Sequence, residues 1–278
     1  MPEQTEKHLK VIRPSDGRIT LQFLRLWEYR ELLFFLVWRD LKVRYKQTAL
    51  GVTWAILQPL ATMLVMSIFF GRLAKMPSDG VPYPIFAYCA LLPWQMFAFV
   101  LTESGNSLVS NQYLITKIYF PRLIIPVVPV FIALVDFSVA FVMMLGMMIF
   151  YGIVPRATIL LLPLFIGLAV LAALSVGVWL AALTAEYRDV RYTIPFLTQF
   201  WMFATPIAYS SSLVPIKWRF LYGLNPMAGV VEGFRWSLLG TAPTSLAPLF
   251  ASLGMVLVLL WGGLTYFRRL ESTFADVI

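Results

Sequence analysis

An uncharged run of 20 residues, positions 51–70, constrains this chain more than any other feature. As an α-helix it is about 30 Å long, which matches the hydrocarbon core of a lipid bilayer. Several more apolar runs follow along the chain. The sequence therefore predicts an all-α polytopic membrane protein.

The composition indicates the same class. Of the 278 residues, 60% are hydrophobic and only 13% are charged, whereas a soluble domain carries about 25% charged residues. The net charge of +8 lies in short segments between apolar runs, so we expect topology and headgroup charges and no nucleic-acid partner. Cys89 is the only cysteine and His8, in the polar N-terminal tail, the only histidine, so neither a disulfide within the chain nor a metal site is expected.

Hydropathy divides the chain into three parts. Residues 1–24 form a polar tail, residues 25–50 an amphipathic interface helix, and residues 51–278 a transmembrane domain with six spans. Residues 210–242 are too apolar for an ordinary loop, and they predict two short re-entrant helices or an interfacial hairpin between the fifth and sixth spans. The predicted spans are residues 52–70, 83–101, 123–151, 159–185, 194–209 and 246–267.

Positive charge is distributed unevenly about these spans. Sixteen Lys and Arg residues fall before the first span and in the connections on that same side, and six fall on the opposite side. Because cytoplasmic segments keep the excess of Lys and Arg, both termini are predicted to be cytoplasmic.

The segment before the first span has two faces when it is drawn as a helix. An apolar stripe with tryptophan beside a basic stripe is typical of a helix lying in the headgroup plane. The apolar stripe holds Phe34, Val37, Trp38, Leu41 and Tyr45, and the basic stripe holds Arg39, Lys42 and Lys46.

Small residues recur at every fourth position in the fourth predicted span. This spacing places them on one helix face and lets a neighbouring helix approach closely. We therefore expect a tight helix–helix contact through Ala169, Ala173, Gly177, Ala181 and Ala185.

Asp136 is the only carboxylate deep within a predicted span, while Glu103, Glu186 and Glu232 lie in or near apolar runs. An ionisable group in the membrane is costly and requires a partner or a cavity. A proton relay normally uses several such groups. We therefore favour a hydrogen-bonded carboxyl that orients neighbouring helices.

No catalytic motif is found. The chain lacks the Gly-x-x-x-x-Gly-Lys-Ser/Thr loop, the Gly-x-Ser-x-Gly elbow and the His-Glu-x-x-His zinc motif. We expect no catalytic residue, no cofactor and no nucleotide site in this chain.

Two predicted cytoplasmic connections and two groups of aromatic residues stand out. Residues 104–122 include Leu114, Ile115, Ile118 and Tyr119 beside Lys117, a pattern that suits either a short helix docking on a soluble partner or an ordinary interfacial loop. The second connection is residues 186–192. Aromatic side chains around residues 27–38 and 196–203 fit an interfacial belt, a packed core or a path for sugar rings.

Several of these segments together resemble the permease subunits of ABC-type polysaccharide exporters, which secrete lipid-linked O-antigen, capsule or teichoic-acid chains. The resemblance runs from about residue 25 to the end, and it is specific because the segments occur jointly and in order. They are residues 40–51 with Trp54 and Gln58-Pro59-Leu60, residues 114–122, residues 187–192 with Pro195, Thr205-Pro206, and Asn225-Pro226-Met227 with Glu232 and Arg235.

The resemblance implies a homodimer of six-span subunits in the bacterial inner membrane, bound to two copies of a separate ATPase that holds ATP and Mg²⁺. The substrate would be a glycan linked to undecaprenyl pyrophosphate. It would pass between the two subunits, along first-span and fifth-span residues, and the re-entrant region would close the outer end of the path.

Candidate residues follow from the resemblance and from the residue types. The ATPase-coupling candidates are Leu114, Ile115, Lys117, Ile118 and Tyr119, with a lesser contact through Arg188 and Asp189. The substrate-path candidates are Trp38, Tyr45, Trp201 and Tyr209. The candidates for binding the carrier pyrophosphate are Lys42, Arg44 and Lys46.

Three other functions compete with this interpretation. A drug or small-lipid exporter of the same superfamily often carries a large extracellular domain or a fused ATPase. A membrane-bound glycosyltransferase or acyltransferase needs a metal, nucleotide-sugar or histidine site, which Asp189 alone does not supply. An ion-coupled carrier usually has more spans and more intramembrane charge.

Overall fold

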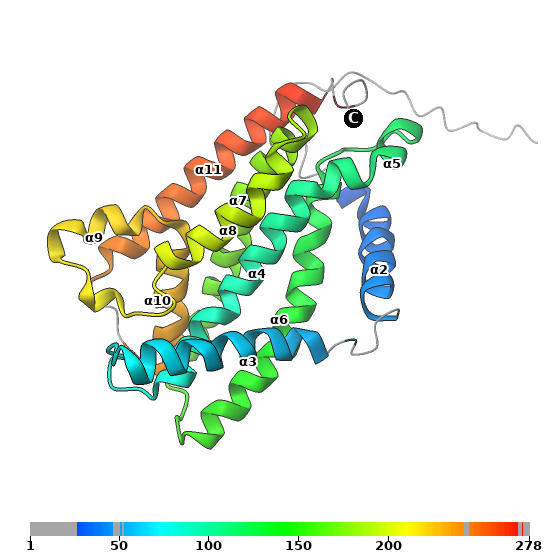
Figure 1. Ribbon diagram of the computed structural model, residues 1–278. Helices are drawn as coiled ribbons and strands as arrows, with labels where there is room; N and C mark the ends of the chain where they lie inside the picture. Colours follow the sequence, from blue (N-terminus) through cyan, green and yellow to red (C-terminus); the bar gives the residue numbers. More distant parts are fainter. Residues whose placement is uncertain (1–26, 47–50, 52, 242–244, 272–273, 275–278) are drawn as a thin grey trace, which may run out of the picture.

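The computed structural model describes residues 27–46, 51, 53–241, 245–271 and 274 (Figure 1). The predicted tail, residues 1–24, lies outside this part of the chain. No strand occurs in the described ranges, and the predicted all-α class is confirmed. The elements are α2 (Arg30–Lys46), α3 (Thr53–Met66), η1 (Ser67–Leu73), α4 (Tyr83–Ser110), α5 (Gln112–Lys117), α6 (Ile124–Phe150), η2 (Ala157–Leu161), α7 (Leu162–Glu186), α8 (Val190–Ala204), η3 (Ser211–Leu213), α9 (Ile216–Gly223), α10 (Pro226–Leu239) and α11 (Ala247–Glu271).

Among the described residues, five helices are long and apolar enough to cross a membrane, and they coincide with five of the six predicted spans. The predicted fifth span corresponds to α8, whose 15 residues extend only about 22 Å, less than the bilayer core. The five bilayer-length helices cover Thr53–Leu73, Tyr83–Ser110, Ile124–Phe150, Ala157–Glu186 and Ala247–Glu271.

α4 is the central helix and is longer than the sequence predicts. In the most apolar 18-residue stretch of α4, 78% of the residues are buried, compared with 17% in the corresponding stretch of the first span. The helix continues past residue 101 because the polar side chains there are satisfied by backbone carbonyls. Thr102 Oγ1 donates to the Ala98 carbonyl at 2.9 Å, and Ser104 Oγ donates to the Pro126 carbonyl at 2.6 Å.

α7 packs against α4 through the small residues predicted for this role. Ala169, Ala173 and Ala181 are fully buried. A Cβ atom added to Gly177 would lie only 3.0 Å from Ser104 Cβ. The two backbones therefore approach closely, and the predicted small-residue contact is confirmed.

α8 and the segment that follows it run beside α4 in the opposite direction. Near the end of α4, a Cβ added to Gly105 would lie 2.6 Å from Ile194 Cδ1. At its start, Tyr83 Oη donates to the Ala208 carbonyl at 2.6 Å. Residues 194–208 thus extend along most of the length of α4.

The described part of the segment between α8 and α11 holds η3 and two short helices, α9 and α10. The predicted re-entrant position of these helices stays a prediction. α10 begins where Asn225 Oδ1 accepts a hydrogen bond from Met227 N at 3.0 Å, with Pro226 in the first turn. It ends at Gly240, whose φ of 72° closes the helix in the left-handed conformation. α10 packs against α4, α7 and α11.

Arg235 of α10 is buried under the segment that follows α8. Its side chain donates from Nη2 to the Ile207 carbonyl at 3.0 Å, and its guanidinium carbon lies 3.5 Å from the centroid of the Phe86 ring. Burial lowers the pKa of Arg235 to about 10, so the group stays charged at neutral pH. The Arg235 side chain therefore connects α10 to α4 and to the segment after α8.

Candidate functional site

A cavity of about 480 Å³ lies between α3, α4, α6 and α8, and Arg44 of α2 reaches its wall. Its volume is in the range of small-molecule sites, about 300–1,000 Å³. Its polar lining includes Gln58, Thr62, Gln95, Thr102, Glu103, Asp136, Thr198 and Gln199, and its aromatic lining includes Trp54, Trp94, Phe99 and Phe137.

This lining suits a hydrophilic ligand with apolar faces. Amides, hydroxyls and carboxylates in the middle of bilayer-length helices are costly when they face lipid, so they gather around a cavity that water or a ligand can occupy. The amides and hydroxyls can exchange hydrogen bonds with a polyol, and the flat rings offer apolar surface. The cavity is lined from α3 and α8, the elements that correspond to the predicted first and fifth spans.

Asp136 joins α6 to α2. Tyr45 Oη donates a hydrogen bond to Asp136 Oδ1, and Arg44 Nη2 lies 2.8 Å from Asp136 Oδ2. The Arg44 guanidinium also lies 4.5 Å from the centroid of the Phe99 ring. Burial, and then the hydrogen bond to Asp136, raise the pKa of Tyr45 to about 12, so the phenol remains a donor at neutral pH. The predicted hydrogen bonding of this carboxyl is confirmed, and its partners lie on a neighbouring helix.

A double-mutant cycle measures this ion pair. We expect Asp136→Asn and Arg44→Gln each to destabilise the protein, and the pair to show a coupling energy of about 1 kcal/mol, because both side chains are partly exposed. Thermal unfolding of the four proteins in one detergent gives the coupling. Additive effects of the two substitutions would show that the contact contributes nothing to stability.

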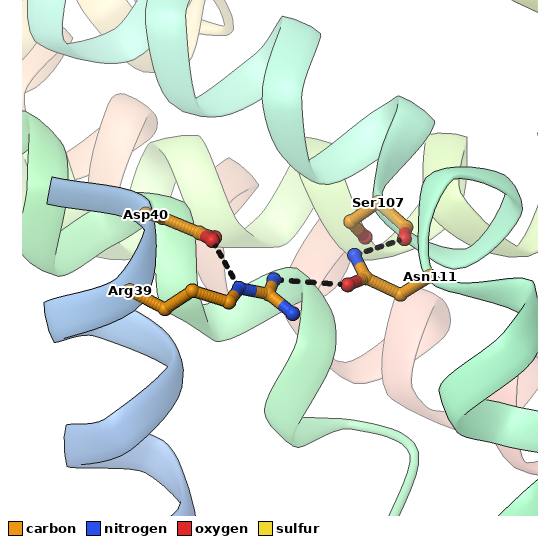
Figure 2. Close-up of polar contacts among 4 residues, drawn as sticks. All are labelled: Arg39, Asp40, Ser107 and Asn111. Carbon is orange, nitrogen blue, oxygen red and sulfur yellow. Dashed lines mark hydrogen bonds and ion pairs between the residues drawn. The ribbon is translucent and has the colours of Figure 1, made fainter. Parts of the chain in front are cut away.

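A second contact joins the middle of α2 to the junction of α4 and α5. Arg39 Nη2 donates to Asn111 Oδ1 at 3.0 Å, and Asn111 Nδ2 donates to the Ser107 carbonyl at 2.9 Å (Figure 2). Arg39 Nε also pairs with Asp40 at 2.7 Å. A smaller pocket of about 210 Å³ lies at this contact, and Glu103 lines both this pocket and the main cavity.

α2 lies alongside the first half of α6 (Figure 1), and its predicted place in the headgroup plane stays a prediction. Leucine side chains, and not the aromatic stripe, form the face of α2 that packs against the bundle. Leu36 is buried and Leu32 and Leu33 are half-buried against the cluster that includes Ile132 of α6. Phe34 and Trp38, placed on the predicted apolar stripe, are exposed.

None of the four predicted path residues belongs to the lining of this cavity. Trp38 is exposed, with Lys42 Nζ 5.2 Å from its ring centroid. Tyr45 meets the cavity through Asp136. Trp201 donates to Asn225 Oδ1 at 2.9 Å, and the hydroxyl of Tyr209 accepts from the hydroxyl of Tyr222 at 3.0 Å, so both brace the segment after α8.

The cavity residues that the sequence interpretation missed are polar, and their spacing could have identified them. Gln58 and Thr62 are four apart in the first span, and Gln95 and Thr102 are seven apart in α4. Such pairs share one helix face. Polar side chains recurring on one face of an apolar helix are the signal for a cavity wall.

The predicted coupling residues lie within α5, directly after it, and in the turn before α8. Lys117, Ile118 and Tyr119 are exposed, Leu114 is half-buried and Ile115 is buried. The helix ends at Lys117, so these apolar residues do not form one helical face as their spacing predicts. Tyr113, which the interpretation missed, is 74% exposed. Arg188 and Asp189 are exposed in the turn between α7 and α8.

Both of these segments are attached to the C-terminal end of α11. The Arg122 guanidinium donates to the Glu271 carbonyl, and the Arg122 backbone N–H donates to Glu271 Oε1 at 3.3 Å. Tyr266 Oη donates to Glu186 Oε2 at 2.8 Å. The two segments predicted to meet the ATPase therefore lie at the same end of the bundle.

The three residues predicted to bind the carrier pyrophosphate lie on the surface of α2. Lys42, Arg44 and Lys46 are all exposed, and Arg44 is engaged by Asp136. Within the described ranges, no group of three or more His, Cys, Asp or Glu side chains could hold a metal ion.

Bilayer-length helices around a cavity with polar walls define the class as a membrane transport protein. Residues 31–239 match the family model described as ABC-2 type transporter, and the chain belongs to this family.

Several proteins of similar sequence are named for the export or transport of a polysaccharide. The chain is 29% identical over 256 residues, which cover 91% of this chain and 97% of the other, to the O-antigen export system permease protein RfbA of Myxococcus xanthus. It is 27% identical over 250 residues, covering 89% and 95%, to the protein of the same name from Klebsiella pneumoniae. It is 23% identical over 238 residues, covering 84% and 91%, to the polysialic acid transport protein KpsM of Escherichia coli.

Proposed function

We propose that this protein is the membrane-spanning subunit of an ATP-driven exporter that moves a lipid-linked polysaccharide, most closely an O-antigen, across the bacterial inner membrane. The observation that carries the proposal is the cavity of polar and aromatic side chains between α3, α4, α6 and α8. A glycan cannot cross hydrocarbon unaided because each desolvated hydroxyl costs several kcal/mol. The names of the similar export permeases support the same substrate class.

The energy comes from a separate ATPase subunit in this proposal. The chain has no phosphate-binding loop, so ATP and Mg²⁺ are bound by the partner, present in two copies. The exposed Tyr113, Ile118 and Tyr119 offer the apolar surface, with Arg188 and Asp189 as the lesser contact. Family membership favours this transport role over a glycan-modifying enzyme or an ion-coupled carrier.

We propose six crossings with both termini in the cytoplasm. The excess of Lys and Arg on one side supports this topology. Although α8 is short, α8 and the segment after it extend along α4 from Gly105 to Tyr83, a separation of about 33 Å in a helix, which supports α8 as the fifth crossing. α9 and α10 are then the re-entrant helices at the outer side.

The active unit is a homodimer in this proposal, with the glycan path between the two subunits. Exposed aromatic side chains on α3 and α8 support it, because they offer apolar surface beside the cavity. They are Trp54, Phe196, Phe200 and Phe203. The relative that transports polysialic acid makes capsule polysaccharide the second candidate substrate class.

The carrier pyrophosphate is proposed to meet Lys42, Arg44 and Lys46, the two lysines being the stronger candidates because Arg44 already contacts Asp136. Replacing all three with glutamine should reduce export by about 30-fold, because the two lysines each contribute about 1 kcal/mol near an anionic headgroup. Surface glycan and membrane-inserted protein are both measured by immunoblot.

The matched control is Lys7→Gln, Lys10→Gln and Arg13→Gln, which removes the same charge from the N-terminal tail. Normal export by the α2 triple variant, at normal levels of inserted protein, would remove these residues from the proposal.

Deletion of the gene tests the function directly. Loss of surface polysaccharide with intracellular accumulation of the lipid-linked glycan, both restored by the gene on a plasmid, is the expected result. Unchanged surface polysaccharide in the deletion strain would contradict the proposal. Loss of surface polysaccharide without accumulation would indicate a role in glycan synthesis instead of export.

A further inference from the structure

The fixed charges around the cavity have a definite sign. The charged residues in its lining are Arg44, Glu103 and Asp136. Arg44 lies 2.8 Å from Asp136 and compensates one of the two carboxylates. With Glu103 counted, the lining holds one carboxyl group more than it holds cations, so its formal net charge is negative.

The smaller pocket repeats this arrangement. Its charged residues are Arg39, Asp40 and Glu103, and Arg39 pairs with Asp40 at 2.7 Å. Glu103 is exposed and lines both pockets. Neither the Arg39–Asp40 pair nor the Arg44–Asp136 pair includes it. The lining of each pocket therefore holds two carboxyl groups and one arginine.

We infer that this cavity admits uncharged sugar chains and rejects anionic ones, and that Glu103 is the residue that sets this preference. The inference rests on the proposed function and narrows its substrate class. Hydroxyl groups of a neutral sugar can donate to Glu103, and the amides of Gln58, Gln95 and Gln199 can both donate and accept. A uronate or sialate carboxylate would face a like charge in a partly desolvated site, which is strongly unfavourable.

The anionic carrier group does not conflict with this preference. In the proposed function the pyrophosphate meets Lys42 and Lys46, which are exposed on α2 and do not line the cavity. The preference for uncharged groups therefore applies to the repeating sugars and not to the carrier lipid.

Binding of two labelled probes tests the inference on the full-length protein in lipid nanodiscs. One probe is an uncharged hexasaccharide of mannose, and the other is a hexasaccharide of galacturonic acid. At low ionic strength we expect the neutral probe to bind at least about tenfold more tightly, because like charges in one site are costly. Glu103→Gln should tighten binding of the acidic probe and bring the two affinities within a few-fold of each other.

Three controls make the result specific. Glu31→Gln removes a carboxylate from the exposed first turn of α2, outside the cavity lining, and should leave the ratio of affinities unchanged. Glu103→Asp keeps the charge and should keep the preference. High salt should weaken the preference of the unmodified protein, which provides a test even where Glu103→Gln fails to fold.

The outcomes separate the inference from the proposed function. Equal binding of both probes to the unmodified protein would overturn the inference, and so would a preference that survives Glu103→Gln. In either case the cavity would still bind glycan, and the proposed function would stand. Failure of both probes to bind would contradict the assignment of this cavity to glycan, and the inference would fall with it.

Discussion

Replacing Arg235 with alanine should lower the free energy of unfolding by about 3 kcal/mol or more. The side chain is only 4% exposed, and it donates to the Ile207 and Tyr209 carbonyls. Truncation leaves those acceptors without this donor and opens a void beside the ring of Phe86. The segment after α8 should then detach from α10 more readily.

Thermal unfolding in detergent measures the loss, with a large fall in the midpoint as the expected result. Arg235→Lys should have an intermediate effect, because it keeps the charge but not the planar fork that reaches two carbonyls. Arg191→Ala, on the exposed first turn of α8, is the matched control and should change little. An unchanged midpoint for Arg235→Ala would show that this contact does not hold the segment.

Gly233→Ala should be almost as damaging. The added Cβ would lie 2.1 Å from Cδ1 and 2.2 Å from Cε1 of Phe165, a side chain that is only 2% exposed. The ring sits in the main core and cannot rotate away without disturbing its neighbours, such as Trp236. We expect a loss of about 2–3 kcal/mol from overpacking.

Gly146→Ala is the control for this prediction. Gly146 lies in α6, and a Cβ added there meets nothing within 4 Å, so alanine should be neutral or slightly stabilising. A smaller side chain at Phe165 should partly rescue Gly233→Ala, which a defect unrelated to the overlap would not show. Equal stability of Gly233→Ala and Gly146→Ala would refute the account of this contact.

Much of the helical framework could be predicted because its causes are local. An apolar run of bilayer length leaves the backbone few alternatives to a helix, so five of the six predicted spans correspond to bilayer-length helices. The four-residue period of Ala169, Ala173 and Gly177 marks one helix face. Asp136 had to have a partner at its depth, although its particular partners, Tyr45 and Arg44, depend on how α2 is placed.

The structure differs from the sequence prediction where contacts between helices determine the end of a helix or the burial of a residue. Hydropathy ends the second span at residue 101, but α4 continues because Ser104 finds an acceptor in Pro126 of α6. Ile115 looks like a docking residue, yet it is buried in the cluster that holds Phe120. No local pattern distinguishes an apolar residue that packs inward from one that faces a partner.

Site residues were harder to predict for the same reason. An aromatic residue in an apolar run is equally compatible with a core, a belt and a path. Trp201 and Tyr209 take structural partners in Asn225 and Tyr222, while Gln58 and Thr198 line the cavity. The polar residues were the more informative ones, because only a cavity or a partner explains an amide in the middle of such a helix.

ATPase activity in lipid nanodiscs tests the central proposal most directly. The protein is purified alone and together with the ABC ATPase expressed beside it, with and without a glycan linked to undecaprenyl pyrophosphate. The proposal predicts a stable complex whose ATP hydrolysis changes when the lipid-linked glycan is present, and no hydrolysis by the protein alone. A folded protein that binds no ATPase, or a complex whose hydrolysis ignores the glycan, would contradict it.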